Sequence, residues 1–293
     1  MAVSTGQVES GVGRGEGLGQ ERDEGAIAKI VARVGETKKY RQVSSSIVRR
    51  IAAAEWGKRR SFRAALKATQ SRLHQIYGAY ESAPSYEWAY EVLAEAYAQG
   101  SQEAIRQASA RVMELHASTR ERIPILHQLY PAVWSRIGTP GSVLDLACGL
   151  NPVALPWMGL AEGTAYEAVD IDTERASFLN RYFDLTLVQG RATLVDLVEE
   201  APDTRADVAL LMKTSACLER QRKGSTVRLL DAVRARWAVV TFPAHSLGYK
   251  EKGMPQHYAQ WMREMAAGRS WDVSRIDMAG ELVYVVDKGS EIG

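Results

Sequence analysis

The stretch Ser-Val-Leu-Asp-Leu-Ala-Cys-Gly-Leu-Asn-Pro-Val-Ala-Leu-Pro, residues 142–156, contains the features that decide the fold. Residues 143–146 form a short apolar run with one acid, a pattern typical of a buried parallel strand. Three small residues follow, and the last of them, Gly149, can adopt the positive φ of a tight turn beneath a ligand. Asp145 is expected to orient this turn by accepting hydrogen bonds from its backbone N–H groups. Because parallel sheets bind ligands beyond the carboxyl ends of their strands, the sequence predicts an α/β sheet with a nucleotide-like cofactor at this loop.

The glycine content of the loop distinguishes two classes of cofactor. A dinucleotide fingerprint needs Gly-x-Gly-x-x-Gly, whereas this stretch holds Gly149 alone. The spacing Asp-x-Ala-x-Gly is instead similar to the acid-x-Gly-x-Gly loop of S-adenosylmethionine-dependent methyltransferases, with Ala147 in place of the first glycine. An ordinary strand–turn–helix junction remains the alternative on these residues alone.

Two further acids follow predicted strands at the spacing of a cofactor site. Residues 165–171 form the second strand, and its Asp170 can accept both hydroxyls of an adenosine ribose. We expect a third strand at 185–188, while 192–195 lead to Asp196, placed to accept from an adenine amine. Three acids at successive strand ends favour the methyltransferase over the ordinary junction. Further strands are predicted at 206–212 and 235–242, with a closing antiparallel hairpin of 271–277 and 281–287.

Composition places the chain among globular proteins without a membrane segment. Of its 293 residues, 46% are apolar and 25% charged, and no apolar run reaches membrane-spanning length. The Gly- and Glu-rich start has no apolar core of a secretory signal. Cys148 and Cys217 are too few for a disulfide framework or a cysteine-rich zinc site. We therefore expect a reduced, cytoplasmic protein with no membrane partner and no metal.

The basic residues are concentrated in one part of the chain. From Lys29 to Glu81 thirteen Lys and Arg face three Glu, a balance of 13 − 3 = +10, although the whole chain carries only +2. Helices predicted at 26–34, 44–56 and 61–77 would expose these cations, which suggests a nucleic-acid-binding face. A solvated helical face without a partner is the alternative. The residues expected to contact phosphates are Arg49, Arg50, Lys58, Arg59, Arg60, Arg63 and Lys67.

Three regions are therefore expected along the chain. Residues 1–25 have almost no large apolar groups and should form a disordered tail. Residues 26–115 should form an all-helical, basic RNA-binding region. Residues 116–293 should form a Rossmann-like catalytic domain of the S-adenosylmethionine-dependent methyltransferase type.

Seven short motifs resemble one family, the aminoglycoside-resistance 16S rRNA (guanine-N7) methyltransferases. They are Leu-Asp-Leu-Ala-Cys-Gly-Leu-Asn-Pro (144–152), His-Ala-Ser-Thr-Arg-Glu-Arg (116–122), Leu-Glu-Arg (218–220), Phe-Pro-x-x-Ser-Leu-Gly (242–248), Lys-Gly-Met (252–254), Glu-Trp-Gly (55–57) and Arg-Leu-His (72–74). The resemblance extends from about Lys38 to the C-terminus. The chain departs from the family pattern at His245, where the family has Arg, and at Tyr249-Lys250, where it has Gly-Arg.

The resemblance implies roles for particular residues. Arg122 would hold the methionine carboxylate of S-adenosylmethionine, Asp170 its ribose, and Asp196 its adenine. Met212 and Lys213 would flank the methyl group and the incoming base as the catalytic pair. The full cofactor set would be His116, Ala117, Ser118, Arg122, Asp145, Ala147, Gly149, Asp170, Asp196 and Leu197. Additional RNA contacts would come from Ser246, Lys250 and Lys252.

The family resemblance also implies the reaction and its substrate. The methyl group would go to guanine N7 in the decoding-site helix of 16S rRNA within the 30S subunit. This methylation would make the host resistant to aminoglycosides, and the enzyme would act as a monomer. Guanine N7 has a free lone pair, so the reaction needs orientation rather than a general base, metal or covalent nucleophile. Methylation of adenine N1 in the same rRNA region, or a non-catalytic ribosome-binding role, are the alternatives. An NAD oxidoreductase is disfavoured because the required glycines are missing.

Overall fold

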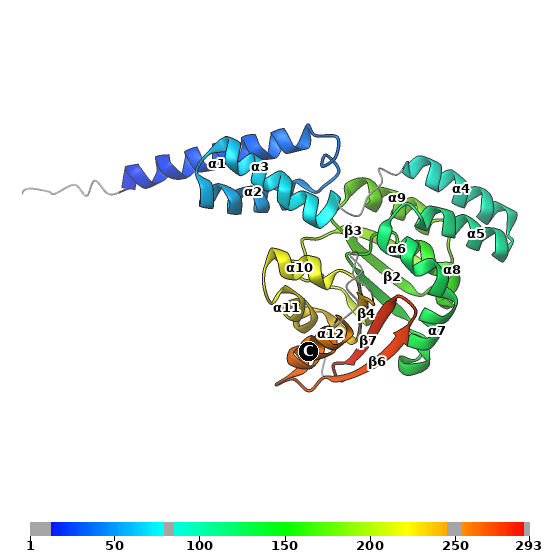
Figure 1. Ribbon diagram of the computed structural model, residues 1–293. Coiled ribbons are helices and arrows are strands. Elements are labelled where there is room, and N and C mark those ends of the chain that lie inside the picture. The colour runs from blue at the N-terminus through cyan, green and yellow to red at the C-terminus, as the bar shows by residue number, and fades with distance from the viewer. Residues whose placement is uncertain (1–12, 79–84, 245–253, 290–293) are drawn as a thin grey trace, which may run out of the picture. The chain divides into compact units, whose positions relative to one another are not determined.

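The computed structural model describes residues 13–78, 85–244 and 254–289 of the chain. These residues fall into two compact units, which are described separately. The helical unit comprises Met1–Gln75, and the sheet unit comprises Ile76–Gly293 (Figure 1).

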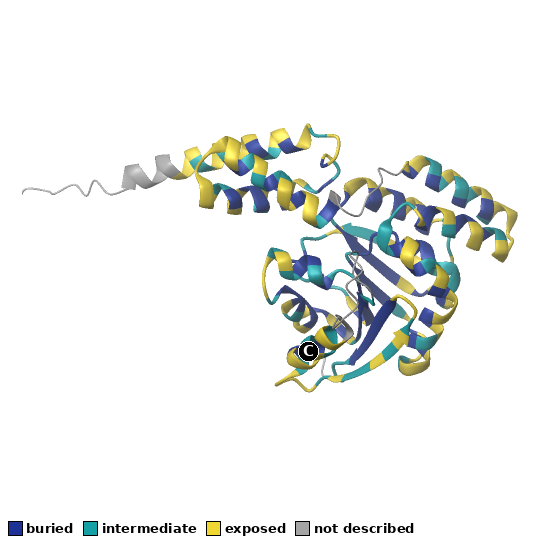
Figure 2. Cartoon of the chain, viewed as in Figure 1, coloured by how far each residue is buried: buried dark blue, intermediate teal, exposed yellow. Residues whose placement is uncertain are grey.

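The helical unit is built from three helices, α1 Gly13–Gly35, α2 Ser45–Arg59 and α3 Phe62–Leu73, followed by the turn His74–Gly78. Their apolar residues recur at helical spacing, and one side of each helix is buried, with Ile30 and Ile47 at its centre (Figure 2). This small core is what the predicted apolar pattern required. The three predicted helices are therefore confirmed in outline.

The first helix begins earlier than the sequence predicted. Residues 13–25 were expected to belong to a disordered tail, but they lie in α1, while residues 1–12 are outside the described part of the chain. Near its middle the helix is held by polar contacts with the following helix, in addition to its buried apolar residues from Ile27 onward. Asp23 accepts a hydrogen bond of 2.9 Å from Trp56 Nε1 and pairs with Arg60, and Glu24 pairs with Arg49. Hydrophobicity alone could not reveal this stabilisation.

The sheet unit contains seven strands in the order β3-β2-β1-β4-β5-β7-β6. Strands β1 to β5 are parallel, and β7 and β6 are added antiparallel, so the predicted closing hairpin is confirmed. The strand bounds are β1 Ser142–Leu146, β2 Ala165–Asp170, β3 Gln189–Leu194, β4 Arg205–Met212, β5 Arg234–Pro243, β6 Asp272–Met278 and β7 Glu281–Asp287.

Helices cover both faces of the sheet (Figure 1). One face carries α4 Tyr86–Gln99, α5 Gln102–Met113, α7 Leu126–Ile137, α8 Leu155–Met158 and α9 Thr173–Phe183. The other carries α10 Ser215–Gln221, α11 Ser225–Ala232 and α12 Met254–Ala266. Short α6 Ala117–Arg122 and the 3₁₀ turns Ile123–Ile125 and Asn151–Ala154 complete the unit. The fold is a doubly wound α/β sheet, as the sequence predicted.

The boundary between the units differs from the sequence-based expectation of 115/116 and lies between Gln75 and Ile76. Helices α4 and α5 belong to the sheet unit because their apolar faces join its core. Tyr86 of α4 stacks on Phe178 of α9 with ring centroids 5.2 Å apart, and Ile105 of α5 lies in the same cluster. Leu93 of α4 lies in this cluster as well, and the partly buried Trp88, Tyr90, Val92 and Tyr97 pack against it.

The third strand was also misplaced. The apolar residues 185–188 precede β3 rather than forming it, and Leu187 is 71% exposed. Gly190 within β3 allows close approach of the Phe183 ring, since a Cβ there would lie 2.1 Å from its Cδ1. Asn180 donates to the Ala192 carbonyl and accepts from its N–H, at 3.0 and 2.8 Å. Because β3 is a half-exposed edge strand that is held by the Asn180 side chain, its sequence lacks the strong apolar pattern by which strands are predicted.

Candidate functional site

The loop after β1 has the backbone shape that the sequence predicted. Gly149 has a φ of 54°, which confirms the expected left-handed conformation. Ala147 also has a positive φ, 52°, although a left-handed alanine costs roughly 1–2 kcal/mol. Cys148 between them donates its N–H to the Val169 carbonyl at 2.9 Å. The loop is thus anchored to β2 and keeps its tight turn even with alanine at the first glycine position.

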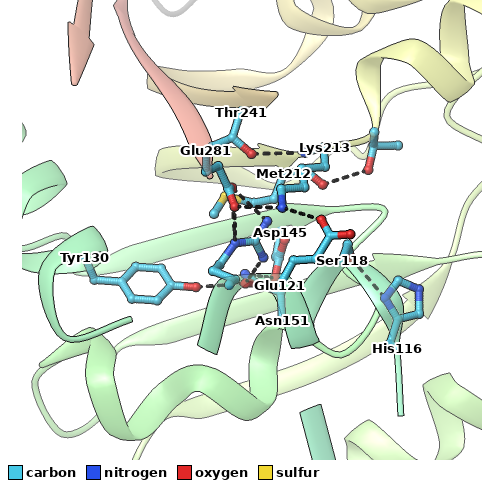
Figure 3. Close-up of polar contacts among 12 residues, drawn as sticks. His116, Ser118, Glu121, Tyr130, Asp145, Asn151, Met212, Lys213, Thr241 and Glu281 are labelled. Atoms are coloured by element: carbon cyan, nitrogen blue, oxygen red, sulfur yellow. Dashed lines mark hydrogen bonds and ion pairs between the residues drawn. The ribbon is translucent and has the colours of Figure 1, made fainter. Parts of the chain in front are cut away.

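Two segments predicted to belong to the cofactor site, 116–118 and 147–149, lie next to each other. A Cβ added at Gly149 would lie 3.2 Å from Cε1 of His116, so only glycine leaves room for this imidazole. His116 Nδ1 and Ser118 Oγ are 2.9 Å apart (Figure 3). Burial lowers the pKa of His116 to about 4, which leaves the ring neutral at pH 7. Ala117 is the first residue of α6.

Asp145 is fully buried and accepts two side-chain hydrogen bonds on one oxygen. Its Oδ2 accepts from Asn151 Nδ2 at 2.9 Å and from the Tyr166 hydroxyl at 2.7 Å. Among the described residues, its Oδ1 has no partner. Burial raises the pKa of this carboxyl to about 6. Side chains rather than loop N–H groups bind Asp145, so its expected role in orienting the turn was wrong.

Asp170 performs that orienting role instead. The register pairs Leu146 with Val169, which brings Asp170 at the end of β2 beside the loop. Its Oδ2 accepts from the Gly149 N–H at 2.9 Å, and its Oδ1 accepts from Ile171 N at 2.7 Å. Burial raises the pKa of Asp170. Oδ1 also accepts from Asp172 N at 3.1 Å, whereas Oδ2 holds a single backbone N–H group, so Oδ2 is the oxygen better placed to accept from a ribose hydroxyl.

A buried cation also contacts Asp170. Arg175 donates from Nη1 to Asp170 Oδ1 at 2.7 Å and from Nε to the Tyr86 hydroxyl at 3.1 Å. Asp172 accepts from the Arg175 N–H at 2.8 Å and from the Tyr77 hydroxyl at 2.5 Å. Burial raises the pKa of Asp172 to about 6. This network fixes the orientation of Asp170 and was not predicted from the sequence.

Arg122, predicted to hold the cofactor carboxylate, is buried and bound by protein groups. Its Nε and Nη2 donate to the Glu281 carboxylate at 3.0–3.2 Å, and its Nη1 donates to Asn151 Oδ1 at 2.9 Å. Burial opposes ionisation of Glu281, but Arg122 and Lys213 hold the pKa of this carboxyl below its ordinary value. The predicted anchor therefore already has a carboxylate partner. Its role toward the cofactor stays a prediction.

Lys213 belongs to the same charged cluster (Figure 3). Its Nζ lies 2.9 Å from Glu121 and 3.2 Å from Glu281, and its side chain is 7% exposed. Its φ of 59° is positive, and its N–H donates to both the carbonyl and the hydroxyl of Thr241 at 3.1 Å. Two carboxylates and a strained backbone thus fix the predicted catalytic lysine next to buried Met212.

The third predicted acid lies on the same edge of the sheet. The register pairs Asp170 with Leu194, and Val195 N donates to the Asp170 carbonyl at 3.2 Å. Asp196 follows, and its Oδ1 accepts from Val198 N at 3.2 Å, while Leu197 is buried. The acids of β1, β2 and β3 thus follow neighbouring strands, as expected.

Glu281 is the functional candidate that sequence reasoning missed. It is 1% exposed and joins Arg122, which lies 159 positions earlier, to Lys213. No local motif links these residues. The only signal was an acid immediately before an uninterrupted apolar strand, at the start of β7.

The predicted RNA-binding cations of the helical unit divide into two groups. Arg49 and Arg60 pair with Glu24 and Asp23 across helices, and Arg50 also has a partner. Lys58 and Arg59 pair with Glu55, which is buried. Arg63 and Lys67 have no acidic partner among the described residues. Ser246, Lys250 and Lys252 lie outside the described part of the chain, as do the departures at His245 and Tyr249.

None of the helices in the described ranges is both long and apolar enough to span a membrane. Nor do those ranges contain a cluster of three or more His, Cys, Asp or Glu arranged to hold a metal ion.

The chain was compared with known proteins. A family model described as "Ribosomal RNA methyltransferase (FmrO)" matches residues 36–285. The chain is 43% identical over 267 residues to a 16S rRNA (guanine(1405)-N(7))-methyltransferase of Frankia casuarinae, covering 90% of this chain and 94% of the relative. It is 40% identical over 268 residues to an enzyme of the same name from Micromonospora echinospora, covering 90% and 98%.

Solved structures agree with the sequence matches. The crystal structure of the 16S rRNA methyltransferase RmtF in complex with S-adenosyl-L-homocysteine gives a TM-score of 0.79 at 34% identity, over 92% of this chain and 99% of that one. The 16S rRNA methylase RmtB gives a TM-score of 0.74 at 29% identity, over 90% and 98%.

Proposed function

Because this chain belongs to the ribosomal RNA methyltransferase family, we propose that it methylates N7 of a guanine in the decoding-site helix of 16S rRNA, using S-adenosylmethionine. The methylation confers resistance to aminoglycosides, because a methyl group and a positive charge are added where such drugs bind. The observation that carries this function is the 43% identity to a guanine(1405)-N7 methyltransferase across nearly the whole of both chains.

The residues at the edge of the sheet fit S-adenosylmethionine. Asp145 Oδ1, buried without a partner among the described residues, offers an acceptor to the methionine ammonium group. Gly149, next to His116, allows the cofactor to approach the backbone. Asp170 Oδ2 and Asp196 offer acceptors for the ribose and the adenine amine. Arg122 would reach the cofactor carboxylate with Nη1 or Nη2, whose N–H groups are not all used by Glu281 and Asn151.

The reaction requires that guanine N7 and the methyl group be oriented correctly, and it requires no proton transfer. When bound, S-adenosylmethionine supplies an electrophilic methyl group on a positively charged sulfur. Guanine N7 attacks with a free lone pair, so the protein has no proton to remove at that atom. Lys213 and Met212, held at the end of β4, border the site and fix the approach of the base. The enzyme thus contributes mainly by holding the reactants in line.

The proposal also names the assembled 30S subunit as the substrate and the cytoplasm as the location of the enzyme. Arg63 and Lys67, both exposed on α3, would bind rRNA phosphates. A base within an rRNA helix must be displaced from its stack to reach the site, which favours recognition of the folded 30S subunit over naked rRNA. We place the enzyme in the cytoplasm as a monomer that requires no metal.

Primer extension on 16S rRNA that has been treated with borohydride and aniline, which cleave the chain at 7-methylguanosine, tests this proposal. Purified enzyme and S-adenosylmethionine should modify one guanine of the decoding-site helix in 30S subunits, and free 16S rRNA much less. Equal modification of both substrates would contradict the 30S assignment. No modification of either would contradict the function.

A further inference from the structure

The helical unit contains a surface pocket that the cofactor site does not use. It is a hollow of about 530 Å³ between the first turns of α3 and one face of α1. Its lining residues are Arg22, Gly25, Ala26, Lys29 and Phe62. The four residues of α1 are spaced at i, i+3, i+4 and i+7, so they share one face of the helix.

Phe62 gives this pocket an exposed aromatic wall. The ring is 42% exposed, and it is the one aromatic among the three large hydrophobic residues that are exposed in the described ranges. It is the first residue of α3 and therefore lies at the open end of that helix. An exposed aromatic beside cations is the arrangement on which proteins stack unpaired bases.

Arg22 and Lys29 add positive charge to the lining of the same pocket. Both are exposed, and neither has an acidic partner in the described part of the chain. In contrast, Arg49 and Arg60 of the same unit are paired with Glu24 and Asp23. Seven helical residues span about 10 Å along the axis, so the two cations can contact different phosphates of one strand.

Gly25 keeps the floor of the pocket open. Glycine inside a helix is less favourable than alanine, yet a Cβ at Gly25 would meet no atom within 4 Å. Neither packing nor a positive φ therefore requires glycine at this position. Its effect is to leave space beside Phe62.

We propose that this pocket binds one unstacked nucleotide of the 16S rRNA. The base stacks on Phe62 over the bare backbone of Gly25, and the adjoining phosphates are bound by Arg22 and Lys29. Single-stranded and bulged RNA is recognised in this way, through aromatic stacking together with backbone contacts. The inference rests on the proposed rRNA substrate and adds a recognition site far in sequence from the cofactor loop.

Binding of 30S subunits to the full-length protein, measured at several salt concentrations, separates stacking from charge. Phe62→Leu should weaken binding roughly 10- to 100-fold, the scale for loss of one base stack, without changing the salt dependence. Phe62→Trp should bind like the wild type. The double variant Arg22→Gln/Lys29→Gln should lower the slope of log K against log salt by about two. Equal affinities of the Leu and Trp variants, or an unchanged slope in the double variant, would overturn the proposal.

A second pair of variants tests the pocket without removing a contact. Gly25→Leu should fold at least as stably as the wild type, because leucine favours a helix and the space is open, but should bind 30S subunits at least tenfold more weakly. Gly35→Leu is the matched control, since Gly35 lies in the same helix outside the pocket and a Cβ there also meets nothing within 4 Å. Similar losses in both variants, or no loss in Gly25→Leu, would contradict the pocket assignment.

The outcome is separable from the proposed function itself. Wild-type protein must modify 16S rRNA and bind S-adenosylmethionine in calorimetry, and the pocket variants must keep that cofactor affinity. Wild-type activity with no effect of Phe62→Leu or Gly25→Leu refutes only the pocket. Absence of wild-type activity refutes the proposed function.

Discussion

Replacing Glu281 with glutamine tests whether the buried charge cluster stabilises the sheet unit. Glu281 accepts three contacts of 3.0–3.2 Å from Arg122 and one of 3.2 Å from Lys213. Glu281 and Arg122 are both only 1% exposed. Glutamine keeps the shape but removes the negative charge, so a buried guanidinium loses its ionic partner. Lys213 retains Glu121.

The expected loss follows from this burial. Breaking a buried ion pair by changing one partner costs about 3–5 kcal/mol of unfolding free energy. For a unit of this size that lowers Tm by roughly 6–20 °C. Glu87→Gln is the matched control. Glu87 also makes a two-point contact with an arginine, Arg181, at 2.7 and 3.1 Å, but both side chains are exposed and water screens them, so its Tm should hardly change.

Thermal unfolding at pH 7, followed by circular dichroism, measures both variants. The pH dependence gives a second check, because the pKa of Glu281 is lowered in the folded protein. The stability that this shift provides is present above the unfolded pKa of about 4.3 and is lost as the pH falls through the folded value. The difference between wild type and Glu281→Gln should therefore shrink below about pH 4. Equal Tm changes for Glu281→Gln and Glu87→Gln would refute this reasoning.

The remaining predictions concern cofactor and RNA binding. Asp170→Ala should weaken S-adenosylmethionine binding by about 1–3 kcal/mol, and an unchanged affinity in calorimetry would contradict the ribose assignment. Burial raises the pKa of Asp145 to about 6, so its protonation between pH 7 and 5 should remove an attraction for the ammonium group and weaken cofactor binding. Asp145→Asn should bind more weakly but without this pH dependence, and parallel pH curves would disprove the contact. Arg63→Gln/Lys67→Gln should reduce the salt slope of 30S binding by about two, with cofactor affinity unchanged, and an unaltered slope would mean a merely solvated face.

The sheet edge was predictable because each of its signals is local. Asp145, Asp170 and Asp196 each follow an apolar run, and parallel strands place their carboxyl ends at one edge. Gly149 indicated the position of the turn in the same way. These predictions needed only a few consecutive residues, and the structure brings all three acids to the expected edge.

The charged cluster was not predictable, because its members are distant in sequence. Glu281 and Arg122 lie 159 positions apart and meet only because β7 adds antiparallel to β5. Glu121, the neighbour of Arg122 in the sequence, pairs with Lys213. Pairings of this kind depend on strand order, which residue patterns specify weakly.

The N-terminal helices show a second limit. Asp23 and Glu24, in the middle of α1, bind partners on α2, a contact that an apolar pattern does not reveal. Salt bridges also divide the basic residues into those with an acidic partner and those without one. Arg60 is held by Asp23, but Arg63 has no acidic partner among the described residues, so a count of charges alone does not separate paired cations from unpaired ones.

Nucleoside mass spectrometry tests the central claim most directly. Purified 30S subunits are incubated with the enzyme and S-adenosylmethionine carrying an isotopically labelled methyl group, and the decoding-site fragment of the 16S rRNA is then digested and analysed. The account predicts one labelled 7-methylguanosine per subunit in that fragment. Labelled 1-methyladenosine instead, or no label although calorimetry shows the cofactor bound, would contradict it.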